Sequence, residues 1–122
     1  MIRVAEIQRL VANTYGVSVD DLKRPDGLGT RLPDKVRPRH LSMYLARTHC
    51  PCLTYGENRP ISLTHIGRLF GNRDHTTVRH AIRSIAKERL ENKKLDIVLN
   101  GLEREIRAIE EARQQSVQEA GQ

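Results

Sequence analysis

The second half of this 122-residue chain contains the stretch Gly71-Asn72-Arg73-Asp74-His75-Thr76-Thr77-Val78-Arg79-His80-Ala81. Gly71 suits the left-handed backbone with which many helices end. Asp74 can cap a new helix, because its carboxylate can accept hydrogen bonds from backbone N–H groups of the first turn. The sequence therefore predicts that one helix ends at Gly71 and that another begins at His75.

Apolar residues recur at helical spacing on both sides of this turn. Ser62 can cap the preceding helix. The apolar positions of that helix are Leu63, Ile66, Leu69 and Phe70, and those of the following helix are Val78, Ala81, Ile82, Ile85 and Ala86. Two short helices that meet across a glycine turn, the second one basic on its exposed side, indicate a helix-turn-helix.

The rest of the chain predicts further helices and no strand. A helix over 4–15 ends at Gly16, a capped turn follows over 18–22, and another helix runs from Pro38 to Arg47. Proline and glycine place loops at 23–36 and 49–60. A last helix carries the apolar stripe Leu95, Leu99, Leu102, Ile106 and Ile109. We expect one compact all-α domain over 1–113 with an extended C-terminal helix, and a polar, frayed tail over 114–122.

Composition narrows the class of partner. Lys and Arg outnumber Asp and Glu by 21 to 15, which favours an anionic partner. Three Tyr, one Phe and no Trp are few for a protein that stacks single-stranded bases, so a duplex is favoured. No signal peptide or membrane-spanning stretch is evident, and the two cysteines form no disulfide framework. We therefore expect a cytoplasmic, nucleoid-associated protein.

The first residues of the helix after Asp74 suit the reading of base edges. In helix-turn-helix proteins these positions enter the major groove. A threonine offers a hydroxyl and a methyl group, a neutral histidine offers one donor and one acceptor, and an arginine can bind guanine through two hydrogen bonds. The candidates are Arg73, Asp74, His75, Thr76, Thr77 and His80, with Arg83 on the groove or the phosphate backbone. The alternative is that these are ordinary first-turn residues and surface histidines.

The run from Gly71 to Ala81 closely resembles the signature Gly-x-Arg-Asp-His-Thr-Thr-Val-x-His-Ala of the C-terminal DNA-binding domain of the bacterial replication initiator DnaA. Ile66-Gly67-x-x-Phe70-Gly71 and Val36-Arg37-Pro38-Arg39 extend the resemblance, which covers about residues 5–106. It implies a Trp-repressor-like helix-turn-helix that binds duplex DNA at DnaA-box-like sites. The six candidates would lie in the major groove.

The resemblance also implies contacts outside the major groove. Arg39 and Arg47, with Ser62 and Arg83, would hold the DNA backbone. An arginine of the basic loop before Arg37 would enter the minor groove, and Arg24 and Arg31 compete for that role because this loop is longer than the family's.

The chain departs from the family pattern at several places. It contains no Gly-x-x-x-x-Gly-Lys-Ser/Thr loop, so we expect no ATP-driven activity and no cofactor. The connector from His49 to Pro60 resembles an insertion, and Thr64 stands where many family members have proline. The expected function is sequence-specific binding of duplex DNA that regulates transcription or replication. The alternative is a nonspecific architectural DNA binder, or an adaptor that dimerises or binds a partner through the helix over 95–109.

Two other chemistries are disfavoured. His49, Cys50 and Cys52, with His40 and His65, could hold a metal, but Cys-Pro-Cys lacks the second ligand pair of structural zinc sites. A cysteine nucleophile would need an oriented base and an oxyanion element, and the sequence identifies neither. We expect no metal and no enzyme activity.

Overall fold

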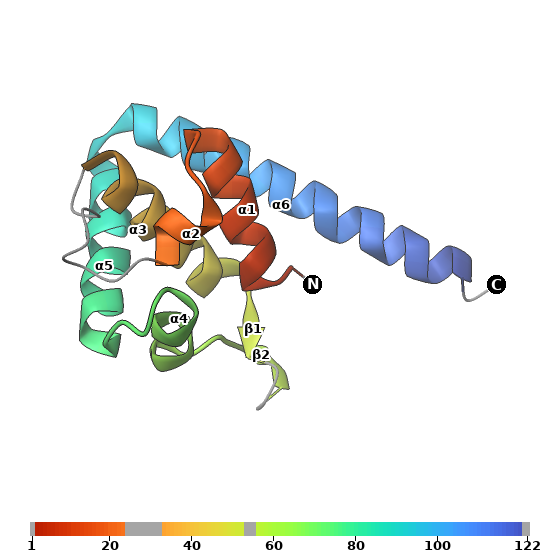
Figure 1. The fold of residues 1–122 in the computed structure, drawn as a ribbon. Coiled ribbons are helices and arrows are strands. Elements are labelled where there is room, and N and C mark those ends of the chain that lie inside the picture. Colours follow the sequence, from red (N-terminus) through yellow and green to blue (C-terminus); the bar gives the residue numbers. More distant parts are fainter. Residues whose placement is uncertain (1, 24–32, 53–55, 121–122) are drawn as a thin grey trace.

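The computed structural model describes residues 2–23, 33–52 and 56–120, which form helices and one small hairpin (Figure 1). The helices are α1 (Val4–Tyr15), α2 (Val19–Lys23), α3 (Pro33–His49), α4 (Leu63–Leu69), α5 (His75–Glu91) and α6 (Lys93–Ala120). Strands β1 (Pro51–Cys52) and β2 (Gly56–Pro60) pair antiparallel between α3 and α4. The predicted all-α class is confirmed, with this hairpin as an addition.

Three predicted boundaries were wrong. Helix α3 begins at Pro33 rather than Pro38, because Pro33 suits a first helical position and Pro38 is accommodated inside the helix. Strands β1 and β2 lie within 49–60, where we expected only a loop. Helix α6 continues to Ala120, so the backbone of 114–120 is helical where we expected a frayed tail.

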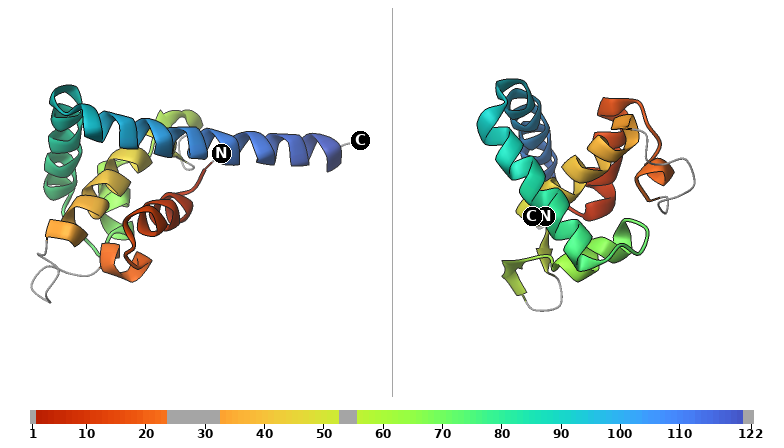
Figure 2. Two further views of the ribbon diagram at one scale, coloured as in Figure 1. Left: turned by 90° about the horizontal axis from the view of Figure 1, so that it is seen from above. Right: turned by 90° about the vertical axis from the view of Figure 1, so that its left-hand side faces the viewer.

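One apolar core holds the helices together. Every helix and the N-terminal segment contribute buried apolar side chains, and these include Ile2, Ile7, Leu22, Leu41, Leu45, Ile66, Phe70, Val78, Ile85, Leu99 and Ile106. Helix α6 crosses one end of the bundle and then extends past it (Figures 1 and 2). Four residues of its predicted stripe, Leu95, Leu99, Leu102 and Ile106, are buried in this core, so the folded chain does not offer them to a partner.

The turn between α4 and α5 depends on close backbone packing. A Cβ atom at Gly67 would lie 2.0 Å from the Arg73 carbonyl oxygen, and the Arg73 N–H donates to the Gly67 carbonyl at 2.8 Å. Gly71 and Asn72 take positive φ angles of 89° and 59°, which glycine and asparagine adopt more readily than other residues. The predicted glycine turn is confirmed, and it fixes where α5 begins.

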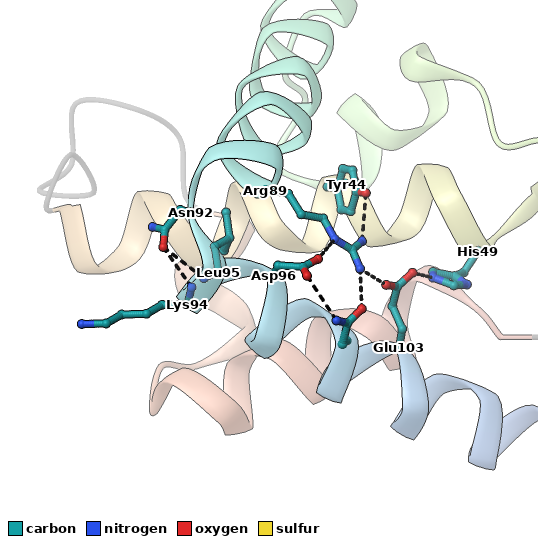
Figure 3. A network of polar contacts seen from close by, with 9 residues as sticks. Tyr44, His49, Arg89, Asn92, Lys94, Leu95, Asp96 and Glu103 are labelled. Carbon is teal, nitrogen blue, oxygen red and sulfur yellow. Dashed lines mark hydrogen bonds and ion pairs between the residues drawn. The ribbon is translucent and has the colours of Figure 1, made fainter.

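A polar network holds the other end of α5 (Figure 3). Arg89 donates to Asp96 and Glu103 of α6, each at 2.7 Å, and to the Tyr44 hydroxyl of α3 at 3.1 Å. Glu103 also contacts His49 at 2.8 Å. Burial raises the pKa of Glu103, but the hydrogen bonds from Arg89 and His49 outweigh it and hold this pKa below its ordinary value. Glu103 therefore carries its charge in a largely buried position.

We predict that Gly67→Ala lowers the free energy of unfolding by about 1–3 kcal/mol, because the added methyl group must displace the Arg73 backbone. Gly101→Ala is the matched control: no atom lies within 4 Å of its added Cβ, and alanine favours a helix interior over glycine by about 0.5–1 kcal/mol. Urea unfolding followed by circular dichroism measures both. Equal shifts in the same direction would contradict the packing argument.

We predict that Glu103→Gln lowers the free energy of unfolding at neutral pH by about 1–3 kcal/mol, because two charge-assisted hydrogen bonds weaken. The folded-state pKa of Glu103 is lowered, so its charge stabilises the fold above the ordinary pKa, and this contribution is lost as pH falls through the lowered value. Urea midpoints measured from neutral to acidic pH should therefore converge for wild type and variant. A constant gap down to the lowest pH would refute this account.

Candidate nucleic-acid interface

Asp74 caps α5 as the sequence predicts. Its side chain accepts a hydrogen bond from the Thr76 backbone N–H at 3.1 Å, and His75 Nδ1 lies 3.3 Å from its other oxygen. Hydrogen bonds from Thr76 are the main cause that lowers the pKa of Asp74. The carboxylate is therefore ionised at neutral pH, and it orients the first turn of α5.

The start of α5 presents a continuous polar surface. Val78, Ala81 and Ile85 point into the core. The exposed residues at this end of the helix include the predicted contacts Asp74, His75, Thr76, Thr77, His80 and Arg83, together with Arg79. The helical repeat thus separates a buried stripe from a solvent-facing one, and the structure brings six of the predicted contacts to one surface.

Arg73 lies at the edge of this surface and is partly buried. Its Nε–H donates to the Phe70 carbonyl at 2.9 Å, which holds the side chain against the turn. Arg73 is therefore fixed both to the turn, through Phe70, and to the cap of α5, because Asp74 follows it directly.

A hollow of about 390 Å³ lies between α4 and the start of α5. It is lined by Thr64, Arg68, Asn72, Arg73, Asp74 and His75. Thr64 and Arg68 were missed as candidates in the sequence, although their four-residue spacing on the exposed side of α4 is a signal that could have identified them. Helix α4 therefore contributes side chains to the candidate interface as well as a scaffold.

The arginines of this surface differ from those that bind the helices together. Arg37 pairs with Glu88, and Arg89 pairs with Asp96 and Glu103. Arg68, Arg79 and Arg83 are exposed and form no side-chain hydrogen bond or ion pair with another described residue. The surface around the start of α5 therefore carries positive charge that the described part of the fold does not neutralise.

The predicted backbone contacts fall in different environments. Ser62 is exposed and caps α4 by accepting from the His65 N–H at 3.1 Å, as the sequence predicts. Arg47 is half-buried and donates to the Ile61 carbonyl, and Arg39 is only 5% exposed. Arg39 is therefore buried, Arg47 is engaged at the Ile61 carbonyl, and the role of both residues at the DNA backbone stays a prediction. Arg24 and Arg31 lie outside the described residues.

The sequence also offered cysteine and histidine side chains as candidates for other chemistry. Burial, with Glu110 and Glu6 adding to it, raises the pKa of the Cys50 thiol to about 12, so this thiol is neutral at physiological pH. Within 2–23, 33–52 and 56–120, no three His, Cys, Asp or Glu side chains are grouped as metal ligands would be. None of the helices in the described part combines the length and apolar character needed to cross a bilayer.

Comparisons with known proteins show the family of the chain. The family described as bacterial DnaA protein helix-turn-helix matches residues 4–85, which include α1 to α4 and the first part of α5. This chain belongs to that DnaA helix-turn-helix family. The matched range contains every residue of the surface around the start of α5, from Ser62 to Arg83.

Individual relatives of this chain are also replication initiator proteins or factors. The chromosomal replication initiator proteins DnaA of Burkholderia multivorans and Paraburkholderia phymatum are each 40% identical over 109 residues, which cover 87% of this chain and 18% of the relative. A solved structure described as a DNA replication initiation factor matches with a TM-score of 0.64 and 32% identity, over 84% of this chain and 27% of that one. The chain thus spans less than a fifth of the length of these curated relatives.

Proposed function

We propose that this DnaA-family domain binds duplex DNA sequence-specifically, with the start of α5 in the major groove. The observation that supports this most strongly is the exposed surface that joins His75, Thr76, Thr77 and His80 to arginines without an acidic partner among the described residues. Base-reading side chains and cationic side chains are the two components that a specific DNA interface requires. The sites would resemble the DnaA box.

Each part of the surface has a distinct role in this proposal. Thr76 and Thr77 contact base edges and thymine methyl groups, His75 and His80 supply further hydrogen bonds, and Arg73 binds a guanine. Arg83, the hydroxyl of Ser62, and the exposed Arg68 and Arg79 hold phosphates, which positions the helix without reading sequence. An arginine of the segment over 24–32, Arg24 or Arg31, enters the minor groove. Asp74 orients the first turn of α5.

The role of such binding is regulatory in this proposal. A bound domain would occupy sites that a replication initiator or RNA polymerase would otherwise use, and it would thereby change replication or transcription in the nucleoid. Dimerisation through the apolar stripe of α6 forms no part of the proposal, because Leu95, Leu99, Leu102 and Ile106 already pack in the core.

The test is selection of bound sequences from random duplexes, followed by anisotropy titration of the selected site against a scrambled site. Specific binding gives a dissociation constant for the selected site that is lower by a factor of about 10³ or more. Equal affinity for both sites would overturn the proposal and favour nonspecific, architectural binding.

We predict that Thr77→Ala and Arg83→Ala weaken binding in different ways. Thr77→Ala costs about 1–3 kcal/mol at the selected site and relaxes preference at one base pair, since a base contact is lost. Arg83→Ala weakens all sequences alike and makes the slope of log affinity against log salt less steep by about 0.9, since one phosphate contact is lost. Arg107→Ala on exposed α6 is the control, and it should change neither property. If Thr77→Ala leaves the base preference unchanged, the assignment of a base contact to Thr77 is refuted.

A further inference from the structure

The β1–β2 hairpin lies at the same end of the molecule as α4 and the start of α5 (Figures 1 and 2). Strand β2 ends at Pro60, and the cap of α4 follows at Ser62. The hairpin is therefore next to the proposed DNA-binding surface in both sequence and space. None of the DNA contacts proposed above involves the hairpin.

The base of the hairpin is fastened to the core. The Ile61 N–H donates to the Cys50 carbonyl at 3.0 Å, and the Arg47 guanidinium donates to the Ile61 carbonyl. Both Ile61 and Cys50 are buried, and Pro51 faces Pro60 in the strand register. The backbone that follows Pro60 is therefore held in place before any partner arrives, which lowers the entropic cost of binding.

Arg59 is exposed at this end of β2, and it forms no side-chain hydrogen bond or ion pair with another described residue. It precedes Ser62 by three residues, a separation of at most about 10 Å in an extended chain. This short separation allows the side chains of Arg59 and Ser62 to reach phosphates on the same flank of one duplex.

We propose that the end of β2 is a second, lateral DNA contact, in which Arg59 binds a phosphate on the flank beside the one held at Ser62. This inference rests on the proposed function, because it takes the position of the duplex from α4 and α5. A guanidinium matches the geometry and charge of a phosphate group. The hairpin would thus lengthen the bound site on the α4 side.

The character of the hairpin favours DNA over a protein partner. The large apolar side chains that are exposed in the described part of the chain, Leu90, Ile97 and Val98, belong to α5 and α6. The exposed side chains described in β2 are Arg59 and Pro60. Among the side chains that the structure describes at the hairpin, Arg59 is the exposed cation, and its charge suits a phosphate backbone.

The test compares wild type with Arg59→Gln on the selected duplex and on duplexes shortened one base pair at a time from either end. On the long duplex, Arg59→Gln should bind about threefold to tenfold more weakly and should show a salt slope less steep by about 0.9. On a duplex that lacks the contacted flank, wild type and variant should bind equally. Phosphate-ethylation interference should show one interfering phosphate fewer for the variant, at that flank.

Arg107→Gln is the matched control, because it removes an equally exposed arginine from α6. Equal unfolding temperatures establish that both variants fold. If wild type prefers the selected site and Arg59→Gln binds the long duplex as tightly as wild type does, the hairpin contact is wrong and the proposed function stands. If wild type binds the selected and scrambled sites equally, the proposed function fails, and the hairpin inference fails with it.

Discussion

The close approach of two backbones at Gly67 and Arg73 is the constraint on which the rest of the candidate interface depends. The Arg73 carbonyl occupies the space that a side chain at position 67 would fill, and the Arg73 N–H bonds the Gly67 carbonyl. This contact sets the end of α4 against the turn, and the turn places Asp74 where it caps α5. The exposure of His75, Thr76, Thr77 and His80 is therefore a consequence of backbone packing several residues earlier.

The two ends of α5 serve different purposes, and the arginines show the division. Near its C-terminal end, Glu88 and Arg89 form ion pairs with α3 and α6 and fix the helix in the bundle. Near its N-terminal end, Arg79 and Arg83 have no acidic partner among the described residues. Arginines are thus paired with carboxylates where α5 is anchored, and they are unpaired among the described residues where the proposed interface lies. Different side chains therefore stabilise the fold and bind DNA in this proposal.

Local signals in the sequence were sufficient for the turn and its caps. Gly71, Asp74 and Ser62 act through backbone groups within three residues, and such effects are visible in a short stretch of sequence. Burial of Arg39 and the hydrogen bond from Arg47 to Ile61 depend on packing between distant segments, so sequence spacing did not reveal them. The hairpin was missed for a related reason, because β1 has only two residues and cannot show an alternating pattern.

The position of Arg47 links the stability of the fold to the proposed interface. The Arg47 side chain, which the resemblance assigns to a phosphate, donates to the Ile61 carbonyl, and Ile61 joins β2 to the cap of α4. In the proposed complex, the phosphate contacts then come from exposed arginines on α4 and α5, and from Arg59 on the hairpin. Arg47 contributes indirectly, because it fixes the segment that carries Arg59 and Ser62. In this proposal, phosphate contacts are distributed over α4, α5 and the hairpin, whereas reading of the major groove is confined to the start of α5 and the residues beside it.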